Sequence, residues 1–530
     1  HTTFISDGLA RAEPARPAPA RRPRTRAPAR RRPTHVALLE PERILMPETM
    51  PNQLPDVAER FMRYVQVDSQ SNPDNDTVTP STPAQHEMAR YLGEELKALG
   101  CTDVTVDEHA YVTGTFAASK GAESAPALML CSHLDSVIDA PASGIKPHVV
   151  HYEGGDLVAG VVNGKTIATT QEQVPDLKDF VGMDIICSDG STLLSADDKA
   201  GVAEICALLK RLGDNPELAH PTLKIAFVPD EEIGHGASLL DLDKLGAAYG
   251  YTVDGEALGE FNYECFNAAH ADVYFKGVMV HPGSAKDVMI NAITVASEFQ
   301  QMVPAFERPE HTEGYEGFYH PIAIEGSASE VKLSYIVRDH DAQIFANRQQ
   351  VLQDIAAFLN KRYGENTVRV EIHQEYRNMA EKFDGYEFLI DYALEANREV
   401  GIEPKPVAAR GGTDGAQLTF RGLPCPNIAT GGYNAHSVRE FVPVPSLEVT
   451  VDLLEKLVAK FAAAASARVA TARRPRHADR RSSHAALAPA RPAPPVARTR
   501  LTCDFAIHSL IATVYAPVHP CQLMAGGSVA

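Results

Sequence analysis

The feature that most constrains this chain is a series of short apolar runs, each followed at once by acidic or histidine residues. The run at 127–130 leads into His133 and Asp135, and the run at 223–228 leads into three consecutive acids that end at Glu232. Apolar runs of this length are typical of buried strands in a parallel sheet. We therefore predict strands at both places, with polar side chains gathered where the strands end.

Amphipathic segments lie between these runs and predict helices. Residues 86–100 place apolar side chains at helical spacing and end on Gly100, which favours helix termination. Residues 195–212 open with acids and close with bases, an order that suits the helix dipole. A last helix is expected over 447–464. This alternation predicts an α/β fold whose mixed, largely parallel sheet is flanked by helices, with ligand-binding residues at the carboxyl ends of its strands.

The pattern changes between residues 267 and 377. Strands are expected there over 271–280 and 332–338, and helices over 287–302 and 342–363. That content predicts a smaller α+β domain. We therefore expect the larger domain in two parts, 48–266 and 378–465, with the smaller domain inserted between them as residues 267–377.

The two ends of the chain differ from the rest. Residues 1–47 and 466–530 contain Arg/Pro/Ala-rich stretches that bury too little apolar surface to fold, so we expect both to be disordered. Residues 34–465 carry 32 basic and 65 acidic residues, a net charge of −33. Such a body repels phosphate, which argues against nucleic-acid binding as the main activity and leaves it open only for the ends. The sequence also lacks a run of about 18 apolar residues that could span a membrane.

Eight cysteines are scattered along the chain without a CxxC pair. This usage is typical of reduced thiols rather than of a disulfide framework. We therefore expect a cytoplasmic protein.

Taken singly, the polar clusters are weak signals. His133 and Asp135 could be unrelated surface residues, adjacent acids at 197 and 198 could cap a helix, and those at 230–232 could be solvated loop charge. A second adjacent acid is more than a cap needs, however. Strand alternation also places His133 and Asp135 on one side, where the carboxylate can orient the imidazole. Each interpretation stays open until the clusters are combined.

Combined, the clusters supply two imidazoles and three carboxylates. Such a set suits two zinc-like divalent ions about 3.5–4 Å apart with one carboxylate bridging them. Glu231 is then left over as a general base. The candidate ligands are His133, Asp197, Glu232, Asp254 and His436.

Several longer segments, in order along the chain, resemble the peptidase T family. They include SADDKAGVAEI from residue 195, PDEEIGHGA from 229, TEGYEGFYH at 312–320 and RGGTDGAQL at 410–418. This family of tripeptide aminopeptidases lies within the dizinc superfamily of aminoacylases and glutamate carboxypeptidases. The resemblance covers roughly residues 48–464 and leaves both ends unexplained.

The resemblance implies a role for each candidate ligand. His133 and Asp254 would hold one zinc, Glu232 and His436 the other, and Asp197 would bridge them; cobalt or manganese could replace zinc. Glu231 would be the catalytic base, with Asp135 supporting His133. Further residues would contact the substrate, with His281 at the oxyanion and Arg338 at the peptide carboxylate: His281, Arg338, Asn291, Arg410 and Asp414.

The resemblance also implies an activity and a partner. The expected reaction is release of the N-terminal residue from tripeptides by a dizinc-bridged hydroxide, in a homodimer joined through the inserted domain. Three departures from the family pattern leave the pocket shape open: Ser136, Glu256 and Ala435. A related dipeptidase or N-acyl-amino-acid amidohydrolase is the alternative activity, and a metal-free peptide-binding protein is the alternative from another class.

Overall fold

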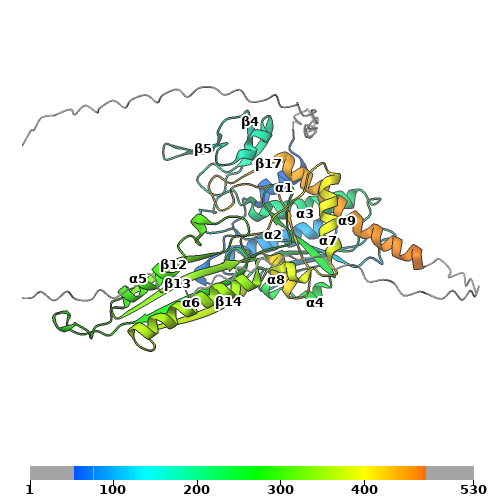
Figure 1. Cartoon of the computed structure of the whole chain (residues 1–530). Helices are drawn as coiled ribbons and strands as arrows, with labels where there is room; N and C mark the ends of the chain where they lie inside the picture. Colours follow the sequence, from blue (N-terminus) through cyan, green and yellow to red (C-terminus); the bar gives the residue numbers. More distant parts are fainter. Residues whose placement is uncertain (1–52, 76, 473–530) are drawn as a thin grey trace, which may run out of the picture. The chain divides into compact units, whose positions relative to one another are not determined.

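The computed structural model describes residues 53–75 and 77–472. Its largest sheet has eight strands, and Figure 1 shows how the elements are arranged. The strands are β1 (Thr102–Val106), β2 (Val112–Phe116), β3 (Leu128–His133), β8 (Leu223–Val228), β9 (Tyr249–Gly255), β10 (Glu260–Asn262), β15 (Lys405–Pro406) and β16 (Asn427–Ala429). Their order is β1-β2-β8-β3-β9-β16-β10-β15. The four central neighbours β8, β3, β9 and β16 run parallel, whereas β1, β2 and β8 pair antiparallel. The predicted mixed α/β sheet is confirmed.

Helices cover this sheet because their apolar faces need burial. The helices are α1 (Asp56–Tyr64), α2 (Pro83–Ala98), α3 (Ala196–Asp214), α4 (Leu242–Leu245), α7 (Glu387–Glu399), α8 (Asp414–Phe420) and α9 (Val444–Ala472). The α3 helix packs on β3 and β9, while α1 and α9 pack on α3. All six residues of β3 are buried, as expected for a strand covered on both faces.

Two small sheets were not predicted from the sequence. A three-stranded sheet orders β17 (Phe441–Pro443), β7 (Met183–Cys187) and β4 (His148–Tyr152), and β5 (Leu157–Val162) pairs with β6 (Lys165–Thr169). The first of these sheets joins the segment just after His436 to a part of the chain about 250 residues earlier. Local sequence patterns carry no sign of such long-range pairing.

A separate four-stranded antiparallel sheet lies between Asn267 and Tyr376. It orders β12 (Phe318–Ser327), β13 (Glu330–Asp339), β11 (Asn267–Lys276) and β14 (Val368–Tyr376). The helices α5 (Ala292–Met302) and α6 (Ala342–Tyr363) run along it in Figure 1, and their apolar side chains share one core with it. Two of these four strands, β12 and β14, were not predicted from the sequence.

Several expected boundaries differ from the observed ones. The helix expected over 287–302 begins only at Ala292, because the Asn291 side chain accepts the amides of Ile293 (2.9 Å) and Thr294 (3.4 Å) and so caps the helix there. The strand expected over 271–280 is Asn267–Lys276, and the last helix continues to Ala472, into the region expected to be disordered. The rest of both predicted tails lies outside the described residues.

The six cysteines of the described segments are free and buried, whereas Cys503 and Cys521 lie outside those segments. Within residues 53–75 and 77–472, no helix is both long and apolar enough to cross a membrane.

Candidate metal centre

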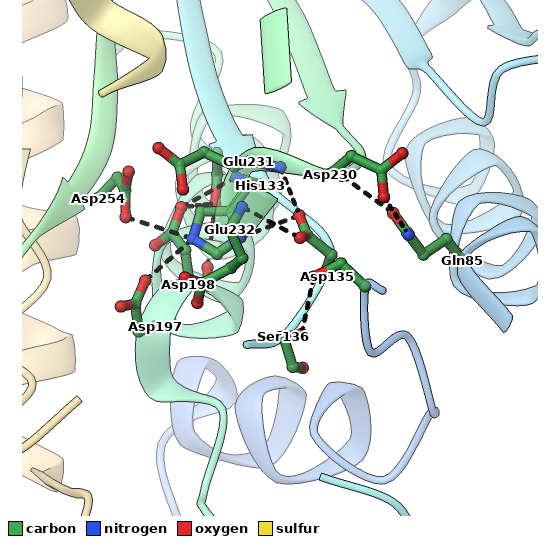
Figure 2. A network of polar contacts seen from close by, with 12 residues as sticks. Gln85, His133, Asp135, Ser136, Asp197, Asp198, Asp230, Glu231, Glu232 and Asp254 are labelled. Carbon is green, nitrogen blue, oxygen red and sulfur yellow. Dashed lines mark hydrogen bonds and ion pairs between the residues drawn. The ribbon is translucent and has the colours of Figure 1, made fainter. Parts of the chain in front are cut away.

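The five candidate ligands meet at the carboxyl edge of the central strands. Figure 2 labels four of them: His133, Asp197, Glu232 and Asp254. His133 is the last residue of β3, and Asp254 lies near the end of the neighbouring β9. Glu232 follows β8 in the short 3₁₀ turn Glu231–Ile233. Asp197 enters from the first turn of α3, and His436 comes from the loop between β16 and β17. Parallel strands bring their ends to one edge, which is why residues far apart in sequence converge.

The carboxylate of Asp197 lies between the two imidazoles. Its Oδ1 is 2.9 Å from Nε2 of His133, and its Oδ2 is 3.4 Å from Nε2 of His436. Asp254 Oδ1 lies 3.5 Å from Nε2 of His133, on the first side. Glu232 Oε2 lies 3.1 Å from Nε2 of His436, on the second. Each side therefore offers one imidazole and one carboxylate, and Asp197 is shared between them.

These residues fit divalent cations by their chemistry and by their unsatisfied atoms. Two groups bring ligand atoms within 4.8 Å of one another, namely His133 with Asp197 and Glu232, and His133 with Asp198 and Asp254. Glu232 Oε1 is buried without a hydrogen-bond partner. A buried carboxylate oxygen is costly unless a donor or a cation satisfies it. Imidazole nitrogens and carboxylate oxygens are both ordinary ligands of zinc.

The electrostatics show how strongly these groups interact. Burial raises the pKa of Glu232 to about 7 and that of Asp254 to about 6. Burial also acts to raise the pKa of Asp197, but hydrogen bonds from His133 and His436 outweigh it and hold that pKa below its ordinary value. Hydrogen bonds with Asp197 and Glu232 raise the pKa of His436 to about 11. The carboxylates thus retain protons on the imidazoles, and bound cations can supply the same positive charge.

Asp135 connects the histidine to the two glutamates. Its buried carboxylate has Oδ1 at 3.4 Å from Nδ1 of His133, on the opposite side of the ring from Asp197 and Asp254 in Figure 2. The same carboxylate accepts the backbone amides of Glu231 (3.1 Å) and Glu232 (3.3 Å). Burial raises the pKa of Glu231 well above its usual range. One side chain therefore orients both a candidate ligand and the candidate base.

Two buried acids that the sequence analysis did not place among the candidate site residues support this cluster. Asp198 accepts the backbone amide of His133 (3.1 Å) and the hydroxyl of Ser132. Glu440 accepts the amides of Leu194 (2.8 Å), Ser195 (2.7 Å) and Asp197 (2.9 Å). Doubling of the acid at 197 and 198 was the available signal for Asp198. Glu440 has no local signal, because its partners lie about 240 residues earlier.

Comparison with known proteins places this geometry in a family. A model of the M20 peptidase dimerisation domain matches residues 263–367. The chain is 45% identical to peptidase T of Clostridium novyi over 403 residues, which cover 76% of this chain and 98% of that relative. It is 44% identical to peptidase T of Geobacillus thermodenitrificans, covering 77% of this chain and 98% of that relative. The chain belongs to the peptidase T family.

Solved structures show the same fold. The aminopeptidase PepT from Bacillus cereus and a tripeptidase from Staphylococcus aureus each superpose with a TM-score of 0.61 at 23% identity, covering 77% of this chain and 98% of theirs. Membership of the peptidase T family, together with the ligand cluster, makes this protein a metallopeptidase.

In this member of the peptidase T family, two of the predicted substrate residues form hydrogen bonds with other residues of the same chain. Asp414 begins α8, and its buried Oδ1 accepts the amide of Ala237 at 2.6 Å; burial raises the pKa of this carboxyl to about 7. The guanidinium of Arg410 donates to the carbonyl oxygens of Gly314 (2.7 Å) and Glu316 (3.0 Å). Arg410 thus bonds the segment 312–316, whereas Asp414 bonds within the catalytic part, and the substrate contacts of both residues stay predictions.

Two other predicted substrate residues lie beyond the far end of β11. His281 is exposed, and its Nδ1 accepts the amide of Gly283 at 3.1 Å, whereas Asn291 caps α5. Ten residues of extended β11 correspond to about 30 Å. The structure therefore does not bring His281 or Asn291 to the ligand cluster of the same chain. Arg338, in contrast, lies on β13 beside the first residues of β11.

Proposed function

We propose that this protein is an aminopeptidase that releases the N-terminal residue from tripeptides with the help of two zinc ions. One observation carries the proposal: Asp197 presents one carboxylate oxygen to each of two imidazole–carboxylate pairs, as a bridging ligand must. The relatives named peptidase T and the tripeptidase that shares the fold support the substrate class. Cobalt or manganese would suit the same nitrogen and oxygen donors.

The protein's own residues would divide the work as follows. When bound, the two ions polarise the scissile carbonyl and lower the pKa of water. The carboxylate of Glu231 takes a proton from the attacking water and returns it to the leaving amine. Asp135 fixes the backbone of Glu231 through its amide, so the carboxylate is presented from a rigid turn. Arg338 donates its N–H groups to the C-terminal carboxylate of the peptide, which its planar fork matches.

We further propose that residues 267–377 form the inserted domain and join two copies of the chain as a homodimer. The match to a dimerisation domain over residues 263–367 supports this assignment. Because His281 lies about 30 Å along β11 from the catalytic segments, its expected contact with the oxyanion would come from a second subunit. The six free thiols support a cytoplasmic location.

The proposed function is tested by hydrolysis of Ala-Ala-Ala, Ala-Ala and N-acetylalanine, before and after treatment with a chelator. We expect cleavage of the tripeptide, loss of activity with the chelator, and recovery with zinc, cobalt or manganese. Cleavage of Ala-Ala or of N-acetylalanine alone would replace the tripeptidase proposal by one of the related activities. Full activity in metal-free protein would overturn the mechanism, and binding of the tripeptide without cleavage would indicate a peptide-binding protein.

A further inference from the structure

One row of side chains crosses the inserted sheet at its catalytic end. Ala268, near the start of β11, pairs with Arg338 on β13 and with Tyr376 on β14. Directly opposed residues of antiparallel strands project from the same face of a sheet. Ala269, the next residue of β11, belongs to the core beneath α5 and α6. The row of Arg338, Ala268 and Tyr376 therefore lies on the face away from those helices.

Tyr376 reaches this face only because of a bulge in β14. Ala269 pairs with Gln374 and Ala268 with Tyr376, so Glu375 is an extra residue on that strand. Under strict alternation, Tyr376 would share the side of Ile372, which packs against the core under the helices. A β-bulge shifts the following side chain to the opposite face.

The bulge brings two partners to the guanidinium of Arg338. Its central carbon lies 4.9 Å from the centroid of the Tyr376 ring, and its Nη1 lies 2.6 Å from Oε2 of Glu375. Ala268 stands between the two strands and is fully buried, and its single methyl group leaves room for the contact. The Tyr376 ring contacts the face of the guanidinium, and the Glu375 carboxylate forms an ion pair with one of its edges. The remaining N–H groups stay free for a carboxylate.

The same ring faces the catalytic segments. A Cβ atom added to Gly412 would lie 2.7 Å from the Tyr376 ring, so this glycine permits the close approach. The hydroxyl of Tyr376 has its pKa raised, mainly by burial and in part by the charge of Glu231. Tyr376 therefore contacts both the Arg338 guanidinium and the loop that carries Gly412.

We propose that Tyr376 is a positioning residue for peptide recognition: its ring orients the Arg338 guanidinium toward the C-terminal carboxylate of the substrate. This inference rests on the proposed function, in which Arg338 binds that carboxylate. It goes further by naming Tyr376 as the residue that sets the orientation of the Arg338 guanidinium. That orientation in turn sets the distance from the substrate's C-terminal carboxylate to the metal centre. Loss of a partly desolvated cation–π contact corresponds to roughly tenfold in a binding constant.

The test compares Ala-Ala-Ala with its C-terminal amide as substrates for the metal-loaded full-length protein. For Tyr376→Leu, we expect the ratio of kcat/KM for the free acid over the amide to fall about tenfold, through KM of the free acid. Tyr376→Phe retains the ring and should restore that KM. In an Arg338→Met background, Tyr376→Leu should cause no further fall, because the group it orients is gone.

Tyr274→Leu is the matched control. Tyr274 lies farther along β11, where its ring contacts the guanidinium of Arg369 at 4.2 Å, so the variant removes an equivalent contact away from the site. We expect it to leave the acid-to-amide ratio unchanged. An equal loss on acid and amide in Tyr376→Leu would overturn the inference, as would a fall in kcat for Tyr376→Phe. If wild-type protein prefers another free peptide, the proposed substrate fails, but the same comparison on that peptide still decides the role of Tyr376.

Discussion

Three of the five proposed ligands, His133, Asp197 and Glu232, are held through their backbone amides by buried hydrogen-bond acceptors. Glu440 fixes the backbone of Asp197, Asp198 fixes that of His133, and Asp135 fixes the turn that carries Glu231. Such outer contacts orient ligands and sharpen metal affinity. The ligand side chains therefore need little rearrangement to receive a cation.

The variant Glu231→Gln tests whether Glu231 acts as the general base and not as a metal ligand. The amide cannot take a proton, so we expect kcat for Ala-Ala-Ala to fall by about 10²- to 10⁴-fold. The metal content, measured by mass spectrometry of the digested protein, should stay that of the wild type. Glu232→Gln is the comparison: because Glu232 contacts His436, its loss should reduce the metal content instead. Activity of Glu231→Gln within tenfold of wild type would refute the assigned base.

The clustering of the candidate ligands could be predicted from the sequence for a physical reason. His133 ends an apolar strand and Glu232 lies in the turn after another, so strand position locates both at the sheet edge. Glu440 could not be found this way, because its partners at 194–197 become neighbours only after β17 pairs with β7. Local patterns report on strand ends, whereas buried acceptors depend on tertiary contacts.

At the scale of single elements, the bulge in β14 shows most clearly where sequence patterns fail. Alternation predicts the facing of residues along a regular strand, and it holds for the core residues of β11. One extra residue at Glu375 reverses the facing of Tyr376. No composition signal marks that position, so Tyr376 could be recognised only in three dimensions.

Variants of Asn291 distinguish a role in capping helix α5 from a role in substrate binding. Asn291→Ala removes the acceptor at the start of α5, so we expect a loss of about 1 kcal/mol in the free energy of urea unfolding. Asn291→Asp retains a capping acceptor and should recover most of it. If Asn291 instead contacts substrate, the Asp variant should keep its stability and still show an altered KM for Ala-Ala-Ala.

The helix-free face of the inserted sheet contains a pH-sensitive cluster. The Asp272 carboxylate contacts Ser334 (2.6 Å), Lys332 (2.9 Å) and His270 (3.0 Å). Burial acts to raise the pKa of this carboxyl, but these partners outweigh burial and lower it to about 2. A pKa below the unfolded value of about 3.9 contributes stability above pH 4, and this contribution is lost as the pH falls toward 2. We expect the difference in unfolding free energy between wild type and Asp272→Asn, measured in chelator-treated protein, to shrink across that range. A pH-independent difference would contradict this account.

At the scale of the whole folded part, contacts form between two segments that lie far apart in the sequence. The segment 410–418 contacts the segment 312–320 through Arg410, whose guanidinium also lies over the rings of Phe266 (5.1 Å) and Phe318 (5.7 Å). Gly412 of the same loop lies against Tyr376. The catalytic segments thus contact the inserted sheet at two points, through Arg410 and through Gly412.

The variant Arg410→Ala should weaken the contact between the segment 410–418 and residues 312–316. Loss of several charge-assisted hydrogen bonds should lower the local opening free energy of residues 312–316 by about 2 kcal/mol, or roughly 30-fold in cleavage rate by limited proteolysis. Arg421→Ala is the control, because Arg421 donates to carbonyls of Ala237 and Leu240 within the catalytic part. Unchanged cleavage at 312–316 in Arg410→Ala would contradict the proposed contact.

The two-sided carboxylate of Asp135 has a consequence for how the protein responds to its ligands. It contacts the ring of His133 on one side and the amides of Glu231 and Glu232 on the other. Ordering of the histidine and ordering of the base turn are therefore thermodynamically linked, and such linkage is reciprocal. A peptide analogue that engages Glu231 should slow the release of metal, and loading with metal should tighten the analogue by the same factor.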